Sequence, residues 1–503
     1  MKKPLINLND KQIEELKKSI KEIKWYRQAV VTKLPYAGTP MLSVMEKVSY
    51  PFLHTREPKE HEGYMSLEGM RAIVKEHIDS AMKSIDVIDE KYHKFESVYN
   101  NMKKILKKAE SVDIENLKIE KLMGFFIDMD DANYDFWQDS FFVDHFDAEG
   151  EIFLKKELKK HNLNIIHEHL SKLMRPQKIN FVELSNLELC KVALNVKNKD
   201  FTEKELLEML LVMAKNHYFV QNSWGNVNIL QEKDFLEPLN EIISEDKDRI
   251  REMIKEYENL ENNTKKEYEE LLNKYSLPKE IINLLHMFRT LATWRDERKE
   301  IVLRSNHFYE LISRRFSKEF DTDIKIIYNA FPFELRKVRT KKDLDDLNTD
   351  FNNRNTGLIV GHIKDNESNL LMSGKEAKEV MSLLNSNFLE EYEEIKGVVA
   401  SKGDTGKKFI RGKVNIILGE THFTKFNEGD VLVTPMTRPE FLPLMKKAKA
   451  IITDEGGLTC HAAIVSRELG VPCIIGTQVA SKKLFDNREV EMNMETGIIK
   501  LVE

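Results

Sequence analysis

The sequence has very little cysteine, with three residues among 503. Three scattered thiols are too few for a disulfide framework or a cysteine-based zinc cluster. The sequence also lacks any apolar run of roughly 18 residues, the length of a membrane-spanning helix, and it opens on a polar segment. A net charge of only −6 gives no basic footprint for nucleic acid. These absences predict a cytoplasmic protein with no membrane or nucleic-acid partner and no metal site.

Two stretches of different composition divide the chain. Its 503 residues exceed one ordinary core, and 41% hydrophobic with 32% charged residues is typical of folded domains. Long helical patterns fill the first part, whereas 11 of the 20 glycines lie between Gly397 and Gly497. We therefore predict a multidomain α plus α/β protein, with a large, mostly α-helical region over residues 1–395 and a second domain over residues 396–503.

Helical periodicity in the first region begins after Asn9 or Asp10, either of which can cap a helix. Residues 33–51 break this pattern with prolines and a glycine, so we predict a loop there. Residues 352–374 are polar and rich in turn-forming residues, and we expect no regular element before a helix near residues 375–394.

Residues 114–160 combine many aromatic side chains with aspartates. Aromatic residues at helical spacing normally pack in a core, and an acidic exposed face would then be plain solvation. The alternative is a pocket lined by rings with a few polar groups, as in sites for small molecules. Under that alternative Trp137 and His145 are candidate substrate-binding residues. The sequence leaves both interpretations open.

The second region alternates short β-branched runs with short helices, which predicts an α/β layer structure. We expect helices near residues 439–447 and 460–469. The expected strands are residues 412–418, 430–434, 449–453, 471–475, 489–492 and 498–502.

Residues 451–476 predict a strand, a loop, a helix and a second strand. His461 falls in the first turn of that helix, where free backbone N–H groups and the helix dipole favour an anion. Gly456 and Gly457 allow the backbone to approach a phosphate, and the Thr459 hydroxyl can orient the ring or phosphoryl oxygens. A histidine here is either a nucleophile that accepts a phosphoryl group or a structural cap, and its surroundings favour the nucleophile.

The run from Gly456 to Pro472 resembles the phosphohistidine signature of the phosphoenolpyruvate (PEP)-utilising enzymes. This family includes PEP synthase, pyruvate phosphate dikinase, phenylphosphate synthase and rifampin phosphotransferase. Residues 397–406, 430–439 and 495–501 are similar to other parts of the family's mobile domain. The resemblance implies that residues 396–503 form a β/β/α swivelling domain that carries phosphohistidine.

For chemistry, the resemblance implies a two-step transfer through His461. The imidazole takes a phosphoryl group from ATP, and the domain then swings to hand the group to an acceptor. The resemblance assigns Gly456, Gly457, Thr459, Thr437 and Arg438 to phosphate binding. We rank Arg438 above Arg467, which we expect to point away from the histidine.

The helix expected around residues 280–312 gains charge after an apolar face. It is similar, more weakly, to a helix of the rifampin phosphotransferase type that carries an Arg-Glu pair and a following basic residue. On that resemblance Arg295 and Arg298 are candidate substrate-binding residues. The alternative is that both arginines form ordinary ion pairs on a helix surface.

We find no segment that resembles the family's ATP-grasp nucleotide-binding domain or its large PEP-binding barrel. We therefore expect ATP and Mg²⁺ to be bound by a separate ATP-grasp subunit, with none bound by this chain. The helical region would hold a small-molecule phosphoryl acceptor. The alternative from another functional class is a non-catalytic binding or regulatory protein that uses its swivelling domain as a docking module.

Overall fold

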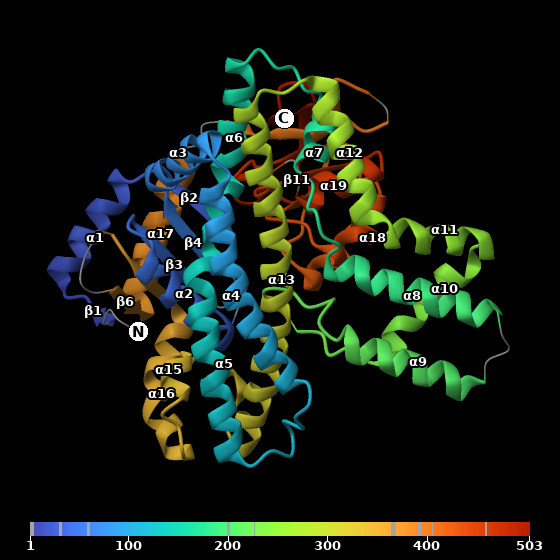
Figure 1. The fold of residues 1–503 in the computed structure, drawn as a ribbon. Coiled ribbons are helices and arrows are strands. Elements are labelled where there is room, and N and C mark those ends of the chain that lie inside the picture. The colour runs from blue at the N-terminus through green and yellow to red at the C-terminus, as the bar shows by residue number, and fades with distance from the viewer. Residues whose placement is uncertain are drawn as a thin grey trace.

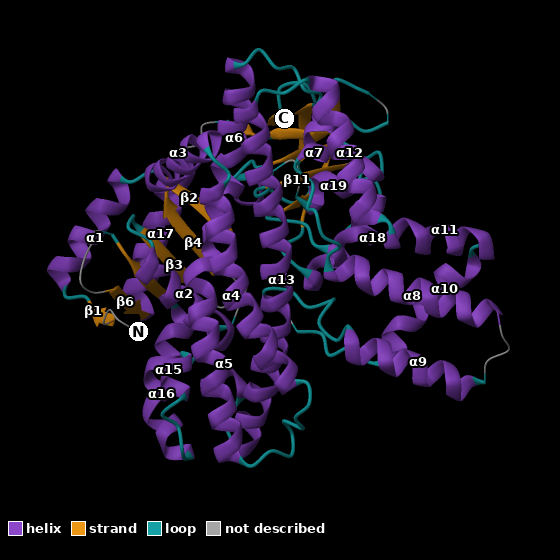
Figure 2. Cartoon of the chain, viewed as in Figure 1, coloured by secondary structure: helices purple, strands orange, loops and turns teal. Residues whose placement is uncertain are grey.

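The computed structural model describes residues 5–29, 33–57, 61–198, 202–225, 227–363, 369–390, 394–404, 406–457 and 460–502. Helices make up most of this part of the chain, and the strands gather in two sheets (Figures 1 and 2). The chain is thus mostly helical with a strand-rich carboxyl-terminal region, as the sequence predicts. No described helix combines the length and the apolar composition that crossing a membrane requires.

A six-stranded sheet in the first region was not predicted. Its strand order is β1-β6-β5-β3-β4-β2, and β1 pairs with β6 in parallel while the other pairs are antiparallel. Alternate side chains serve two cores, since Phe52 packs toward α2 and Leu53 toward α1 and α17. The strands are β1 (Leu5–Asn7), β2 (Trp25–Ala29), β3 (Phe52–Arg56), β4 (His61–Ser66), β5 (Leu358–His362) and β6 (Asn369–Ser373).

The predicted loop over residues 33–51 is wrong, because helix α2 (Leu34–Lys47) occupies most of it. Pro35 lies in the first turn, where proline is tolerated. Eleven of the helix's 14 residues are buried, so the helix shows no polar face and the sequence lacks the usual amphipathic signal. The turn-rich assignment of residues 352–374 is also wrong, because β5 and β6 form there.

Long helices pack against this sheet and against one another. Helix α13 (Lys279–Glu319) has 41 residues and runs through the middle of the molecule (Figure 1). It contacts α3, α4, α5 and α2. The surrounding helices are α1 (Asp10–Glu22), α3 (Leu67–Lys83), α4 (Asp86–Ala109), α5 (Ile119–Ser140), α6 (Asp144–Lys160), α14 (Ile324–Tyr328), α15 (Pro332–Leu335), α16 (Lys341–Thr356) and α17 (Gly374–Glu390).

A smaller helical group projects to one side of α13 (Figure 1). It has an apolar core of its own around Leu189, Leu210 and Ile250. The helices of this group are α8 (Phe181–Asn198), α9 (Glu203–Asn216), α10 (Leu236–Ser244) and α11 (Lys247–Glu258). Helices α7 (His167–Leu173) and α12 (Leu260–Tyr275) pack together between this group and the carboxyl-terminal region.

The carboxyl-terminal region forms an eight-stranded sheet in the order β7-β14-β13-β9-β10-β11-β12-β8. All six predicted strands and both predicted helices are present, with bounds shifted by a few residues. The strands are β7 (Ile395–Lys396), β8 (Val398–Ser401), β9 (Phe409–Ile416), β10 (Val431–Thr434), β11 (Ala450–Thr453), β12 (Cys473–Ile475), β13 (Glu489–Asn493) and β14 (Ile498–Leu501). The helices are α18 (Leu442–Lys447), α19 (His461–Glu468) and α20 (Ala480–Lys483).

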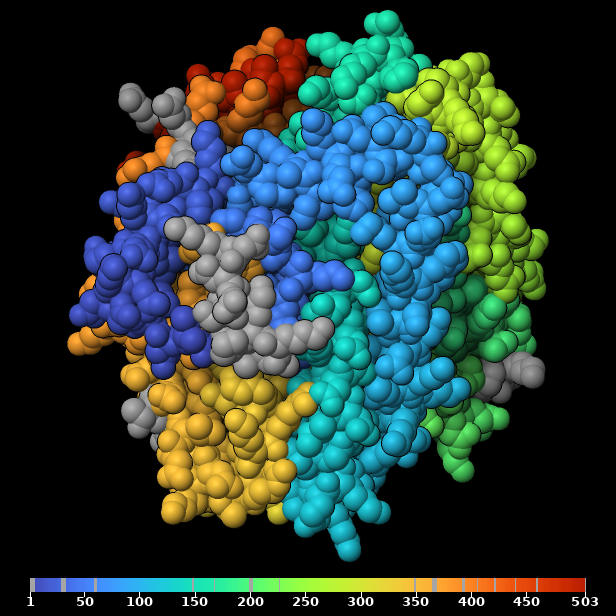
Figure 3. Space-filling model, turned by 60° about the vertical axis from the view of Figure 1, so that its left-hand side comes forward, coloured from blue at the N-terminus to red at the C-terminus, as the bar shows by residue number. Residues whose placement is uncertain are grey.

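Strands β9 to β12 run parallel, so their carboxyl ends lie at one edge of the sheet. The loops that follow β10 and β11 start at this edge, which is where parallel sheets commonly bind ligands. The region also packs against the rest of the chain, and Figure 3 shows its orange and red atoms next to blue amino-terminal and teal atoms. Both loops therefore lie near the helical region.

Candidate active site

His461 is the first residue of α19, directly after the loop that leaves β11. Its Nδ1 lies 2.9 Å from the hydroxyl of Thr437, a residue of the loop that leaves β10. The parallel pairing of β10 with β11 therefore brings the two side chains together. Burial, together with the nearby Lys299 ammonium, lowers the pKa of His461 to about 4. At neutral pH the imidazole is uncharged, which leaves one ring nitrogen able to act as a nucleophile.

The glycine loop before His461 is shaped by two close approaches. Gly456 has a φ of +118°, and a Cβ atom at this position would lie 2.6 Å from Cys460 Sγ, so only glycine fits without strain. Gly457 faces Glu151 across the interface, with Glu151 Oε2 3.3 Å from where a Cβ would be. Thr459, the predicted hydroxyl of this loop, lies outside the described residues. Burial raises the pKa of the Cys460 thiol to about 11, so this neighbour of the histidine stays protonated.

His461 opens onto a cavity of about 1430 Å³ between the carboxyl-terminal region and the helices. Gly456, Gly457 and Thr437 line it on the histidine side. Much of the opposite wall is aromatic or apolar, with side chains from the first sheet, α2, α5 and α13. One face of α13 contributes residues at helical spacing, namely Phe288, Leu291, Ala292, Arg295, Asp296, Arg298, Lys299, Val302, Ser305 and Asn306.

Charged side chains on α13 face this cavity opposite the histidine. Burial lowers the pKa of Lys299, with Asp296 opposing that change, and Lys299 is close enough to His461 to affect its titration. Arg295 lies one helical turn before Lys299 and lines the same cavity. Among the residues that the structure describes, neither Lys299 nor Asp296 has a hydrogen-bond or ion-pair partner. A neutral nucleophile thus faces uncommitted charges across a largely apolar chamber.

Comparison with known proteins identifies this histidine-bearing region. Residues 426–497 match the family model "PEP-utilising enzyme, mobile domain". We call the carboxyl-terminal region that contains this match the mobile domain.

Known relatives of this mobile domain are PEP synthases. A "Probable phosphoenolpyruvate synthase" of Archaeoglobus fulgidus is 53% identical over 105 residues, which is 21% of this chain and 13% of the relative. The phosphoenolpyruvate synthase of Pyrococcus furiosus is 47% identical over 114 residues, or 22% of this chain and 13% of the relative. That of Helicobacter pylori is 38% identical over 126 residues, or 25% and 16%. The matched part of the chain therefore spans only a small fraction of these relatives.

The two candidate arginines of the mobile domain, Arg438 and Arg467, lie in different surroundings. Arg467 lines the cavity, with its Nη1 3.1 Å from the Ser171 hydroxyl of α7. Arg438 is not among the residues that line the cavity, but it lies close enough to Lys299 to lower the pKa of that ammonium, and its Nη1 is 3.9 Å from Glu440. Arg467 does not point away as expected, since it lines the cavity, and its Nε donates to the Ala463 carbonyl within α19. The preference for Arg438 as a phosphate ligand stays a prediction.

The candidate residues of the helical region divide into two groups. Trp137 and Arg295 line the cavity, and so does Arg298, whose guanidinium donates to both oxygens of Asp144 at 2.6 and 2.9 Å. Arg298 therefore forms an ion pair, but the pair is buried and does not lie on a helix surface as the alternative expected. His145 lies outside the cavity lining, bonded to the Tyr50 hydroxyl at 2.9 Å and the Phe142 carbonyl at 3.0 Å, so its contacts are those of a packing residue.

The aromatic segment 114–160 supplies both a core and a pocket wall. Phe126, Phe136 and Leu122 are fully enclosed, whereas Trp137 and Phe146 line the cavity. The sequence left open an aromatic core and a ring-lined pocket. Each of these interpretations applies to one side of the same helices.

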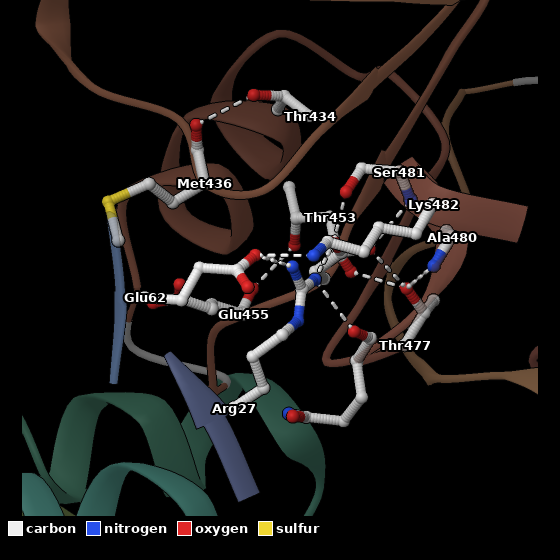
Figure 4. A network of polar contacts seen from close by, with 12 residues as sticks. Arg27, Glu62, Thr434, Met436, Thr453, Glu455, Thr477, Ala480, Ser481 and Lys482 are labelled. Carbon is white, nitrogen blue, oxygen red and sulfur yellow. Dashed lines mark hydrogen bonds and ion pairs between the residues drawn. The ribbon is translucent and has the colours of Figure 1, made fainter. Parts of the chain in front are cut away.

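A second contact holds the mobile domain to the first sheet through the residue that follows β11, Asp454. We call Arg27, Glu62, Asp454 and Lys482 the interdomain clasp. Figure 4 labels Arg27, Glu62 and Lys482 of this group. Arg27 lies 2.7 Å from Glu62 within the sheet and 2.6 Å from Asp454 of the mobile domain, and Lys482 lies 2.6 Å from Glu62. Arg27, Glu62 and Asp454 are almost fully buried. The clasp therefore pairs two positive with two negative charges across the interface.

Sequence reasoning did not single out Lys299, Asp296 or Arg27. The spacing of Arg295 and Lys299, four residues apart on a helix, was a usable signal for a shared face. No comparable signal marks Arg27, because its partner Asp454 is 427 residues away in the sequence.

Proposed function

We propose that this chain carries a phosphoryl group on His461 from ATP to a small-molecule acceptor in the adjoining cavity. The observation that carries the proposal is the neutral imidazole at the start of α19, which lines a large cavity together with the cations of α13. The family match supports phosphotransfer in general terms. Synthesis of PEP is stated only in the names of the relatives.

In the first step, an imidazole nitrogen attacks the phosphoryl group, the N–P bond forms and the P–O bond to the nucleotide breaks. In the tautomer that donates Nδ1–H to the Thr437 hydroxyl, the lone pair lies on Nε2, and we assign the attack to Nε2. Backbone N–H groups at the start of α19 then face the transferred oxygens. Thr437 thus orients the ring, and we propose the tautomer that carries its proton on Nδ1.

In the second step, the acceptor attacks phosphohistidine from the cavity side. Phosphoryl transfer depends on positioning and on neutralising the charge of the equatorial oxygens. Lys299 and Arg295 line the cavity on the helix that faces His461, and Arg467 lines it from α19. We assign charge neutralisation to Lys299 and Arg295, and we leave Arg298 a structural role because Asp144 holds it.

The cavity lining also bears on the acceptor. Trp137, Trp224, Phe141, Phe146 and Phe288 offer a largely apolar and aromatic surface. Such surfaces bind ligands with an apolar body and use a few polar groups to orient them. We infer an acceptor with a sizeable apolar part rather than a small, fully hydrated anion.

We further propose that a separate ATP-grasp subunit binds ATP and Mg²⁺ and charges His461. In the structure His461 faces the acceptor cavity, so the mobile domain has to leave the cavity to meet a nucleotide elsewhere. The family description of the domain as mobile supports this movement. We propose a cytoplasmic protein, in keeping with its three free thiols.

Labelled ATP tests this function. The chain is incubated with β- or γ-labelled ATP, with and without a candidate ATP-grasp subunit. We expect an acid-labile label on the wild type and none on His461→Ala. In parallel, the small donor phosphoramidate should phosphorylate His461 without a partner, as read by ³¹P NMR. No label from either donor would contradict the carrier function and favour a non-catalytic docking module.

A further inference from the structure

The carboxylate of Asp296 is the one charged group on the cavity face of α13 whose role the transfer scheme leaves open. It lines the cavity one turn from Lys299 and next to Arg295. Within the described ranges it accepts no hydrogen bond and forms no ion pair. The side chain is half-buried, so its oxygens are open to the cavity that His461 also lines. A group that enters the cavity can therefore reach this carboxylate.

Three other carboxylates of the cavity lining are already engaged. Asp144 accepts two hydrogen bonds from Arg298. Glu151 lies 2.6 Å from Lys155, and Glu183 accepts the backbone N–H of Asn180 at 2.8 Å. These oxygens are occupied by the fold itself. Asp296 remains available to a group that enters the cavity.

The surroundings of Asp296 set its proton affinity. Burial raises its pKa to about 6, with Lys299 and Arg295 opposing the rise and Glu183 and Glu297 adding to it. At neutral pH the group is a carboxylate that is more basic than an ordinary aspartate. A base is most effective when its pKa lies near the working pH. His461 cannot serve, because it is bonded to phosphorus and its own pKa is lower.

We propose that Asp296 is the general base of the second step, and that the acceptor is therefore an alcohol or a phenol. This inference rests on the proposed carrier function. The acceptor's O–H proton passes to a carboxylate oxygen of Asp296 while its oxygen forms the new O–P bond. The N–P bond breaks, and its electron pair returns to the imidazole of His461. An acceptor that attacks through a carboxylate or an enolate would supply no proton and would be repelled by Asp296.

The test follows phosphohistidine in the full chain with water as the hydroxyl probe. Wild type, Asp296→Asn and Asp296→Glu are charged with phosphoramidate, and the loss of the ³¹P signal is measured from pH 5 to pH 8. Each rate is normalised to the initial amount of phosphohistidine. The rate at which phosphohistidine is lost from the urea-unfolded chain at the same pH is then subtracted. We expect the wild-type rate to rise through about pH 6 and then level, since the carboxylate form is active.

Asp296→Asn should lose this rise and decay about 10²-fold more slowly at pH 7. Asp296→Glu should restore part of the rate and keep a rise with pH, which a merely structural role would not produce. Equal rates and equal pH profiles for wild type and Asp296→Asn would overturn the inference while leaving the carrier function intact. Failure of His461 to take up phosphate would overturn the carrier function, and this inference with it.

Faster transfer to benzyl alcohol than to its matched carboxylate benzoate would support a hydroxyl acceptor. Equal or faster transfer to benzoate would overturn that assignment. Both compounds carry the same ring, so the comparison isolates the attacking group.

Discussion

Two groups of enclosed charges meet the mobile domain, and they differ in how those charges are satisfied. In the interdomain clasp every charge has an opposite charge within 2.7 Å. In the cavity, Lys299 and Asp296 have no such partner in the described part of the chain. Paired charges specify how two surfaces fit, whereas unpaired charges with shifted pKa values mark a site that awaits a ligand. We therefore assign the clasp to holding the two regions together and the cavity charges to the reaction.

The strongest test of this separation is His461→Asn. We expect phosphohistidine formation to be abolished, because asparagine has no nucleophilic ring nitrogen. The free energy of unfolding should stay nearly unchanged, since a histidine at the start of a helix contributes little core packing. Measurements are ³¹P NMR after phosphoramidate and urea unfolding. A large loss of stability would assign His461 to the structural group instead.

Lys299→Met should act on chemistry next most strongly. Removing one preorganised group that stabilises transition-state charge typically lowers the rate by about 10²–10³-fold. Stability should hold or rise, because a half-buried ammonium is replaced by an apolar side chain of similar length. The matched control is Lys318→Met, an exposed position on the same helix. The rate is measured as the single-turnover loss of phosphohistidine. Equal rates for the two variants would contradict a role of Lys299 in the transfer step.

Arg27→Met should show the reverse pattern, with a loss of stability. Breaking a buried ion pair costs about 3–5 kcal/mol, and we expect the lower end of that range because Glu62 keeps Lys482 and Asp454 keeps Ser481. The free energy of unfolding in urea measures this loss. Arg411→Met, which removes an exposed pair with Glu491, should cost at most about 1 kcal/mol. Similar losses of stability for the two variants would show that the clasp contributes no more to stability than an exposed ion pair.

Acid should distinguish the two groups by a smaller effect. The pKa of His461 is about 4 in the folded chain against 6.5 when unfolded, so its contribution to stability is lost as pH falls from 6.5 toward 4. Burial alone would raise the pKa of Glu62, but Arg27 and Lys482 lower it below 4.5, so its contribution survives to lower pH. Between pH 7 and pH 5, wild type should lose about 2 kcal/mol more than His461→Asn, because each pKa unit corresponds to about 1.4 kcal/mol.

Arg27→Met should lose as much as wild type over the same pH range, since the carboxylates of the clasp stay ionised there. Urea midpoints at both pH values give these differences. A drop in His461→Asn equal to that of wild type would mean that His461 does not titrate as described.

Local signals explain what the sequence could predict. Strands β10 and β11 are short β-branched runs, and glycines after β11 precede a short helical pattern, so the sequence alone predicts that His461 lies in the first turn of a helix. Thr437 followed from the family resemblance. Each of these features depends on a few neighbouring residues, which sequence patterns report well.

Long-range pairing explains what the sequence could not predict. β3 and β5 pair across roughly 300 residues, and neither strand has a neighbour in sequence that predicts the sheet. Helix α2 is buried on nearly all sides, so its periodicity carries no signal. The contact of Arg467 with Ser171 and the pairing of Arg298 with Asp144 depend on how separate elements pack.

The clasp also has a property that ordinary domain contacts lack. On the mobile domain, Asp454 accepts hydrogen bonds from the Ser481 backbone at 2.9 Å and from the Thr477 hydroxyl at 3.2 Å. On the sheet, Arg27 retains Glu62. Arg27 and Asp454 therefore each have polar partners on their own side of the boundary as well as across it. The movement that we propose for the mobile domain needs this arrangement, because it leaves neither of these two buried ions unpaired when the contact between them opens.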